Sequence, residues 1–351
     1  MTDIADPRAH SARSLKYPAI LGGLAALLGL AFVVSLATGA VPVSVGDVVR
    51  SLLGMEVDQR TAAVIQMIRL PRAFLAVIVG AALAGAGAAF QGLFRNPLAD
   101  PSLIGVSGGA ALGAVVIIVF GGAVAAVLPF LASPLLLPLA AFAGGIGATF
   151  AIQGLAQSRG QAATATLLLA GIAINALTWA FTGVSIYMAN DAQIRDFTFW
   201  SMGSLASGGW QEVGIVVVPI AAALAVILSR ARALDAMLLG EREALHLGVP
   251  VHRLKHIVMI AAALAVSSAV AVSGVIAFVG IVVPHVVRML AGPDHRIVLP
   301  GSILAGATLL LVADGFARVI VAPSELPIGL VTAAIGSPFF LWLLMRRKKS
   351  L

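Results

Sequence analysis

Residues 102–155, SLIGVSGGAALGAVVIIVFGGAVAAVLPFLASPLLLPLAAFAGGIGATFAIQGL, run for 54 positions without one charged side chain. About 20 apolar residues cross a bilayer as a helix, so this stretch predicts two spans joined by a turn that contains Pro129, Pro134 and Pro138. A membrane-spanning strand would instead alternate apolar and polar residues over about ten positions. The fold class that this stretch predicts is an all-α membrane protein.

The rest of the chain has the same character. Hydrophobic residues make up 60% of the 351 residues, charged residues make up 11%, and the mean hydropathy is +1.05. Soluble domains are roughly half apolar and a quarter charged. We expect a transmembrane domain over 18–345 between an N-terminal tail, 1–17, and a basic tail, 346–351. Together with the two spans above, ten transmembrane helices are predicted: the other eight cover 18–41, 73–93, 166–188, 213–228, two short spans within 257–290, 297–313 and 328–345. Pro71 is expected to open the second span, which is rich in Gly and Ala and is interpreted as an interior helix. The repeated G-x-x-x-G face in 105–113 predicts helix packing, and short polar turns are expected at 157–161 and 314–327.

The basic residues indicate how the spans are oriented. Ten spans put both termini on one side, and that side carries 16 of the 22 Lys and Arg residues. The positive-inside rule therefore predicts that both termini are cytoplasmic, and it accounts for the net charge of +7 without nucleic-acid binding. Arg69, Arg72 and Arg318 lie at helix ends on the opposite side, where this rule does not explain them.

The segment 229–256, SRARALDAMLLGEREALHLGVPVHRLKH, holds eight of the 37 charged residues in 28 positions, and we call it the polar island. Its pattern predicts two short helices, 235–239 and 241–247, that are broken at Gly240, with Gly248 ending the second. Because the island maps to the cytoplasmic side, we interpret it as a docking surface for a soluble partner. The alternative is a solvated loop.

Several function classes are disfavoured. Every charged residue maps to a loop or a span end, whereas ion-coupled secondary transporters usually place an ionisable side chain at membrane depth. That class remains an alternative, because some such transporters use only carbonyls and hydroxyls. The spans contain no nucleophile–base pair and no metal cluster, so we expect no catalytic residue, no metal and no cofactor in this chain. The six histidines map to the cytoplasmic side and are interpreted as structural or docking residues: His10, His246, His252, His256, His285 and His295.

The sequence also lacks an ATP-binding motif of its own. A P-loop requires a Gly-Lys pair, and none of the four lysines follows a glycine. If ATP drives this protein, ATP and Mg²⁺ bind to a separate ATPase subunit, and the chain itself is a translocation subunit rather than an enzyme.

Six ordered segments resemble the permease family of bacterial importers for iron complexes, heme and vitamin B12. The resemblance covers the chain from about residue 60 to its end. The segments are RLPR at 69–72, FQGLFRNPLADPSLIGVSGG at 90–109, LLLAG at 167–171, FVGIVVPH at 278–285, GPDHR at 292–296 and SELPIG at 324–329.

The resemblance implies a type II ABC importer permease of ten helices in the bacterial inner membrane. Such a permease works as a homodimer with two ATPase subunits and a periplasmic binding protein. By position, Arg69, Arg72 and Arg318 match arginines that pair with glutamates of the binding protein. Thr164 and Ala165 match a cytoplasmic gate that often has two hydroxyls, so Ala165 departs from the pattern.

The resemblance also assigns the ATPase contact and a substrate class. The coupling pattern G-x-x-x-A-x-x-L-G matches the polar island, and Glu243 lies within it. Residues 190–200 and 202–205 most resemble heme-uptake members, so heme is the expected substrate, with ferric siderophore and cobalamin as alternatives. The predicted coupling residues are Gly240, Glu243, Ala244, Leu247 and Gly248.

Overall fold

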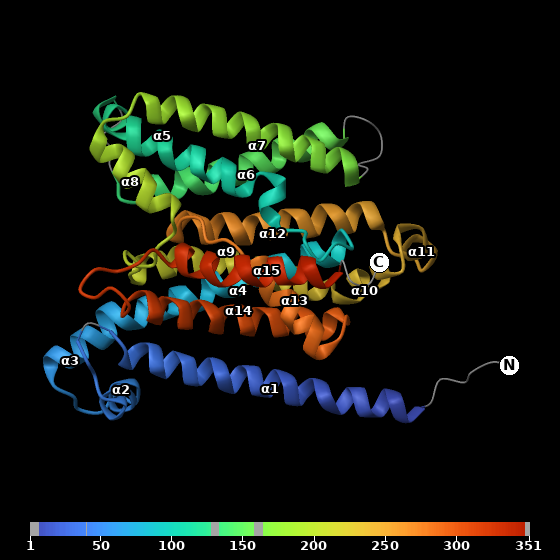
Figure 1. Cartoon of the computed structure of the whole chain (residues 1–351), viewed down its shortest axis with the longest axis horizontal. Coiled ribbons are helices and arrows are strands. Elements are labelled where there is room, and N and C mark those ends of the chain that lie inside the picture. The colour runs from blue at the N-terminus through green and yellow to red at the C-terminus, as the bar shows by residue number, and fades with distance from the viewer. Residues whose placement is uncertain (1–6, 40, 128–132, 158–163, 348–351) are drawn as a thin grey trace.

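Figure 1 shows the computed structural model of the chain, which describes residues 7–39, 41–127, 133–157 and 164–347. All regular elements within these ranges are helices. The ten longer ones are α1 (Pro7–Ala37), α4 (Leu70–Leu93), α5 (Val106–Val127), α6 (Leu136–Gln157), α7 (Thr164–Tyr187), α9 (Trp210–Ser229), α12 (Val251–Ser273), α13 (Val279–Ala291), α14 (His295–Ala317) and α15 (Ile328–Arg347). The short ones are α2 (Val45–Leu52), α3 (Gln59–Ala63), the π-helix η1 (Val64–Arg69), the 3-10 helix η2 (Pro101–Ile104), α8 (Asp191–Ser201), α10 (Ala231–Leu238) and α11 (Glu241–His246).

The predicted all-α membrane fold is confirmed, since each predicted span corresponds to one of the ten longer helices. In the part of the chain that the structure describes, eight helices are long and apolar enough to cross a membrane, and the apolar helices Val279–Ala291 and Ile328–Leu343 are shorter. The expected pair of short spans in 257–290 is unequal. It consists of the 23-residue α12, which ends at Gly274 with φ +65°, and the 13-residue α13.

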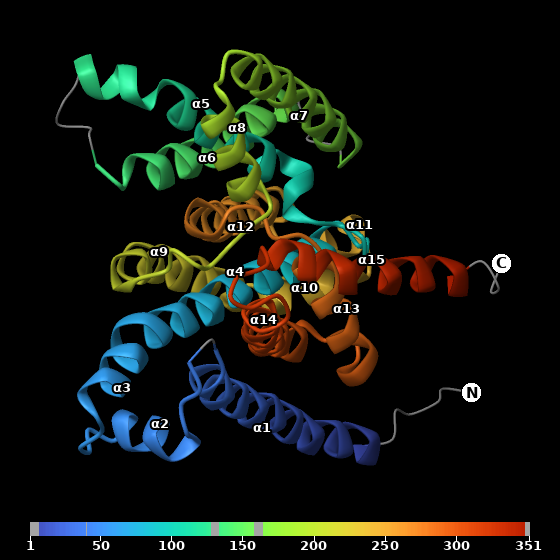
Figure 2. The same ribbon diagram turned by 60° about the vertical axis from the view of Figure 1, so that its left-hand side comes forward.

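Helix α4 forms the centre of the bundle, with α9, α12, α13 and α14 around it (Figure 2). Glycines make these close approaches possible. A Cβ on Gly80 would lie 2.3 Å from the carbonyl oxygen of Gly306 in α14, and a Cβ on Gly87 would lie 2.0 Å from that of Gly280 in α13. The expectation of an interior, glycine-rich helix is confirmed, and the small residues let the helix backbones meet.

The repeated G-x-x-x-G face in 105–113 also packs as expected. A Cβ on Gly109 would lie 2.2 Å from the carbonyl oxygen of Gly144, and a Cβ on Gly113 would lie 2.1 Å from that of Ala140, both in α6. Helices α5 to α8 lie together along one side of the bundle and α1 lies along the other (Figures 1 and 2).

Pro71 was expected to open the second span, and it does lie in the first turn of α4. No loop precedes this turn, however, because η1 ends at Arg69 directly before α4, so Gln59–Leu93 is one continuous helical stretch. A proline clashes with the carbonyl four residues before it and donates no backbone hydrogen bond. The wider π-turns, in which the Leu70 amide donates to Ile65, accommodate this break in the α-helical pattern.

Helices α2 and α8 are among the short helices that were not predicted. Ser44 caps α2 by accepting from the amide of Asp47, and Asn190 and Gln193 form a capping box at the start of α8. Both helices lie at the same end of the bundle as the α14–α15 connection. We call this the arginine end, and the opposite end, with α10, α11 and the start of α1, the island end (Figure 1).

Candidate functional site

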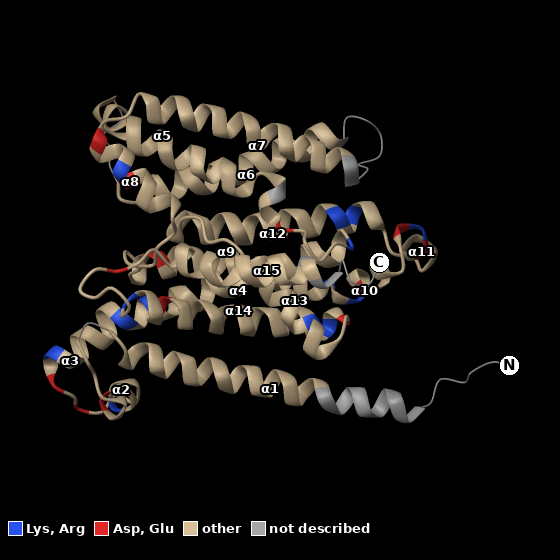
Figure 3. Ribbon diagram, viewed as in Figure 1, with Lys and Arg blue, Asp and Glu red and all other residues tan. Residues whose placement is uncertain are grey.

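Charged residues gather at the two ends of the bundle and are sparse between them (Figure 3). At the arginine end, the helix starts and ends bring five charged side chains together, which we call the arginine cluster: Arg69, Arg72, Asp314, Arg318 and Glu325. At the island end lies the polar island. These two regions contain the residues that the sequence singled out.

Arg72, in the first turn of α4, has a carboxylate on each side of its guanidinium. Its Nε and Nη2 donate to Asp314 Oδ1 at 3.0 and 2.9 Å. Its Nη1 lies 3.1 Å from Glu325 Oε1 and 2.9 Å from Oε2. The Asp314 side chain is 1% exposed and that of Glu325 is 39% exposed, so one carboxylate is buried and the other is at the surface.

Arg318 and Arg69 are held by the end of α1. Arg318 Nη2 donates to the carbonyl and hydroxyl oxygens of Ser35 at 3.1 and 2.9 Å, and its Nε lies 3.1 Å from Asp314 Oδ2. Arg69 donates to the carbonyl oxygens of Leu36 and Ala37 at 2.7 and 3.0 Å and to that of Val41. The three arginines therefore lie together, as their matching positions suggest, but each is only 6–8% exposed.

The ninth predicted span ended too early, at Ala313, and Asp314 was placed in the polar turn 314–327. In the structure α14 continues to Ala317, so Asp314 lies in its last turn, still at a span end, and is 1% exposed. The helix continues to Ala317 because Arg72 and Arg318 neutralise the carboxylate, and a paired charge is tolerated where a lone one is not.

The polar island forms α10, α11 and the first turns of α12, and the predicted break at Gly240 is confirmed. Gly240 has φ +123° and Gly248 has φ +82°, conformations that side-chain-bearing residues rarely adopt. Ala244 is fully buried, whereas Glu243 is exposed and Leu247 is 64% exposed. The glycines therefore set the backbone conformation of the segment, the Ala244 side chain is buried, and the side chains of Glu243 and Leu247 are exposed.

Two polar contacts fasten the island to the bundle. Asp235 in α10 accepts from the amide of His295 at 2.7 Å and lies 2.7 Å from its Nδ1. Burial raises the pKa of the Asp235 carboxyl, but the hydrogen bonds from His295 outweigh burial and hold this pKa below its usual range. The second contact joins Lys255 Nζ in α12 to Glu241 in α11 at 2.8 Å. These histidine and lysine partners were not predicted as site residues.

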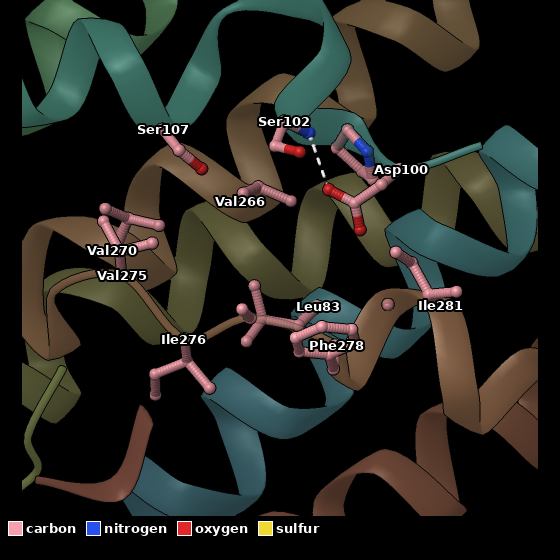
Figure 4. A pocket seen from close by; sticks show the side chains of 13 residues that line it. Leu83, Asp100, Ser102, Ser107, Val266, Val270, Val275, Ile276, Phe278 and Ile281 are labelled. Carbon is pink, nitrogen blue, oxygen red and sulfur yellow. Dashed lines mark hydrogen bonds between the residues drawn. The ribbon is translucent and has the colours of Figure 1, made fainter. Parts of the chain in front are cut away.

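Inside the bundle, a cavity of about 210 Å³ lies between α4, the start of α5 and the segment that joins α12 to α13 (Figure 4). Its lining is apolar apart from Asp100, Ser102 and Ser107. Asp100 caps η2 by accepting from the Ser102 amide at 2.8 Å. Burial raises the pKa of the Asp100 carboxyl, although hydrogen bonds from the amide and hydroxyl of Ser102 act to lower it. Pockets for drug-sized ligands are about 300–1,000 Å³. The cavity is therefore too small to enclose a large chelate.

For the two predicted gate residues the structure describes only the backbone. Thr164 and Ala165 begin α7, and their side chains lie outside the described residues. The polar turn expected at 157–161 falls largely outside them as well. Among the described residues, no group of three or more His, Asp or Glu side chains is arranged to hold a metal ion.

Comparison with known proteins agrees with this architecture. The FecCD transport family matches residues 27–346. The hemin transport system permease protein HmuU of Yersinia pestis is 44% identical over 80% of this chain and 83% of its own length. The cobalamin import system permease protein BtuC of Halobacterium salinarum is 40% identical over 83% of this chain and 76% of its own. A solved structure, described as a metal-chelate type ABC transporter in an inward-facing conformation, aligns with a TM-score of 0.81 at 34% identity, covering 94% of this chain and all of that one.

Proposed function

The chain belongs to the FecCD transport family, and we propose that it is the permease that carries heme from a periplasmic binding protein into the cytoplasm. Permeases of this family are non-catalytic, multi-pass membrane components of ABC importers for iron chelates, heme or vitamin B12. Membership implies ATPase and binding-protein partners, and it decides against the ion-coupled secondary transporter.

Heme is favoured over the other chelates by sequence similarity. The hemin permease of Yersinia pestis shares 44% of its aligned residues with this chain, against 40% for the cobalamin permease of Halobacterium salinarum. Residues 190–200, which resemble heme-uptake members, form most of α8 at the arginine end. Cobalamin is the second candidate because its permeases are nearly as similar.

The observation that carries the ATPase-coupling role is the shape of the polar island. Two short helices with a glycine break lie at the island end of the bundle, and the second presents Glu243 and Leu247 while Ala244 packs inward. An exposed apolar side chain beside charged ones is typical of a docking surface. We assign ATPase contact to this segment, with Gly240 and Gly248 maintaining its backbone shape.

The arginine cluster is proposed to receive the binding protein. Arg69, Arg72 and Arg318 lie together at the end opposite the polar island, which suits partners on opposite sides of a membrane. All three are buried, so a carboxylate of the binding protein reaches them only when a residue of this chain gives way.

The remaining features of the proposal concern topology and assembly. The start of α1, the end of α15 and the polar island lie at one end of the bundle (Figure 1). We assign that end to the cytoplasm, with tails 1–17 and 346–351 flanking the transmembrane domain, 18–345, in the bacterial inner membrane. Two copies of the chain form the translocation unit, and Thr164 and Ala165 at the start of α7 form its cytoplasmic gate.

Reconstitution tests the function and the substrate together. The permease and its ATPase are placed in proteoliposomes with the cognate binding protein inside and ATP outside, and efflux of hemin, cyanocobalamin or a ferric siderophore from the lumen is measured. We expect ATP-dependent movement of hemin well above the other two. Transport of cyanocobalamin or the siderophore without hemin would overturn the substrate, and transport without the ATPase would overturn the importer.

A further inference from the structure

Within the arginine cluster, the two carboxylates bound to Arg72 differ in how firmly they are held. Asp314 receives Nε and Nη2 of Arg72 and Nε of Arg318, and its side chain is 1% exposed. Glu325 receives Nη1 of Arg72, and its side chain is 39% exposed. Breaking a buried ion pair costs far more free energy than breaking a partly exposed one, which water and salt already screen. Glu325 is therefore the replaceable partner of Arg72.

The position of Glu325 in the chain suits this role. It lies in the connection between α14 and α15, after the exposed apolar residues Val319, Ile320 and Val321. Asp314, in contrast, is fixed within α14. A side chain in a connection changes position at less cost than one inside a packed helix.

The charge of the cluster changes when Glu325 leaves. With Glu325 in place, three arginines face two carboxylates, a formal net charge of +1. Without it the charge is +2 and Arg72 Nη1 loses its acceptor. A carboxylate from outside restores both the charge and the hydrogen bond, because it has the same chemistry as Glu325.

We propose that Glu325 is an exchangeable counter-ion, which occupies Arg72 in the undocked permease and is replaced there by a carboxylate of the binding protein. This inference rests on the proposed docking role of the arginine cluster. It explains how a buried arginine accepts a partner, and it makes Glu325 a competitor that weakens docking.

The test is the affinity of the binding protein for the complete permease–ATPase complex in nanodiscs. The binding protein is used without ligand, so that the result does not depend on which chelate is carried. Glu325→Gln keeps the shape of the side chain and removes its charge, and we expect the dissociation constant to fall about three- to fivefold. The matched control is Asp196→Asn, which removes an exposed carboxylate of α8 at the same end, and it should leave the constant within twofold.

Arg72→Gln separates the exchange from docking itself. Asp314 keeps its partner Arg318 in this variant, so the buried carboxylate of the cluster is not left unpaired. We expect Arg72→Gln to weaken binding, and we expect Glu325→Gln to have no further effect on top of it. If Arg72→Gln weakens binding while Glu325→Gln fails to tighten it, or if Asp196→Asn tightens it equally, the exchange is overturned and docking stands. If Arg72→Gln leaves the affinity unchanged, docking at the cluster is overturned, and the exchange with it.

Discussion

Arg72, in the first turn of α4, and Asp314, in the last turn of α14, form a buried ion pair in which two guanidinium nitrogens lie 3.0 and 2.9 Å from Asp314 Oδ1. The two residues are 242 positions apart in the sequence. Asp314 also pairs with Arg318 at 3.1 Å. One carboxylate therefore pairs with two arginines and joins α4 to α14 at the arginine end.

Replacing Asp314 should destabilise the isolated permease strongly. Asp314→Asn preserves the shape of the side chain but leaves two buried guanidiniums without their shared counter-charge, at a cost of about 3–5 kcal/mol. Thermal unfolding in detergent measures this as a lower midpoint than that of the native chain. Asp196→Asn is the exposed control, and a midpoint for Asp314→Asn equal to that of the control would contradict the structure.

Replacing Gly240 by alanine should weaken the coupling between ATP hydrolysis and substrate transport. Gly240 has φ +123° and ψ +155°, a region that is nearly restricted to glycine and costs other residues about 1–3 kcal/mol. We expect Gly240→Ala to lower the amount of substrate moved per ATP hydrolysed. Gly214→Ala is the matched control, because a Cβ there meets no described atom within 4 Å. A native ratio in Gly240→Ala would remove this conformation from the mechanism.

Loss of the contact between Asp235 and His295 should loosen the polar island. Asp235→Ala removes two hydrogen bonds to His295, one from its amide and one shared with Nδ1, and we expect a loss of about 1–3 kcal/mol in permease stability. Because the pKa of Asp235 is lowered, this contribution is present above the unfolded value of about 3.9 and is lost as the pH falls through the folded value. The measurement therefore belongs at pH 7. Arg232→Ala, an exposed change on the same helix, should have little effect, and equal unfolding midpoints for the two variants would refute the contact.

The carboxyl of Asp100 should make stability depend on pH in the opposite sense. An acid whose pKa is raised by burial stabilises the fold below its unfolded pKa of about 3.9, and the contribution is lost as the pH rises through the folded value. Asp100→Asn keeps an oxygen for the Ser102 amide and removes the titration. We expect its unfolding midpoint, relative to the native chain, to rise as the pH increases from below the unfolded pKa towards neutral. A difference that is the same below the unfolded pKa and at neutral pH would contradict a raised pKa.

The spans and the glycine break followed from the sequence because both are local properties. Hydrocarbon thickness sets the length of an apolar helix, and a glycine with positive φ interrupts a helix wherever it lies. The unequal lengths of α12 and α13 were missed because the apolar run 257–290 does not show that α12 already begins at Val251 or that α13 begins only at Val279. Helices α2 and α8 were missed because they are short and not strongly apolar. Their caps, Ser44 with Asp47 and Asn190 with Gln193, were the available signal.

The candidate site was harder to predict because its contacts join distant segments. Hydropathy ended the ninth span at Ala313, since it could not show that Arg72 neutralises the next residue. The family resemblance predicted that the three arginines lie at one end, but it did not predict that they are buried. The end of α1 lies over Arg69 and Arg318 and covers them. The attachment of Asp235 to His295 likewise depends on packing between α10 and α14.

The short helix α13 is joined to α12 by a non-helical segment within the bundle. Thirteen residues rise about 20 Å, less than the roughly 30 Å of the hydrocarbon core, so 274–278 must complete this crossing as non-helical chain. The neighbouring α12 and α14, with 23 residues each, have no such interruption. Reorienting α13 against α12 therefore requires rotation about the backbone bonds of only a few residues and leaves the hydrogen bonds within both helices intact. Helices α12 and α14 are continuous, and the α12–α13 connection is where one helix can change its angle to the next without losing helical hydrogen bonds.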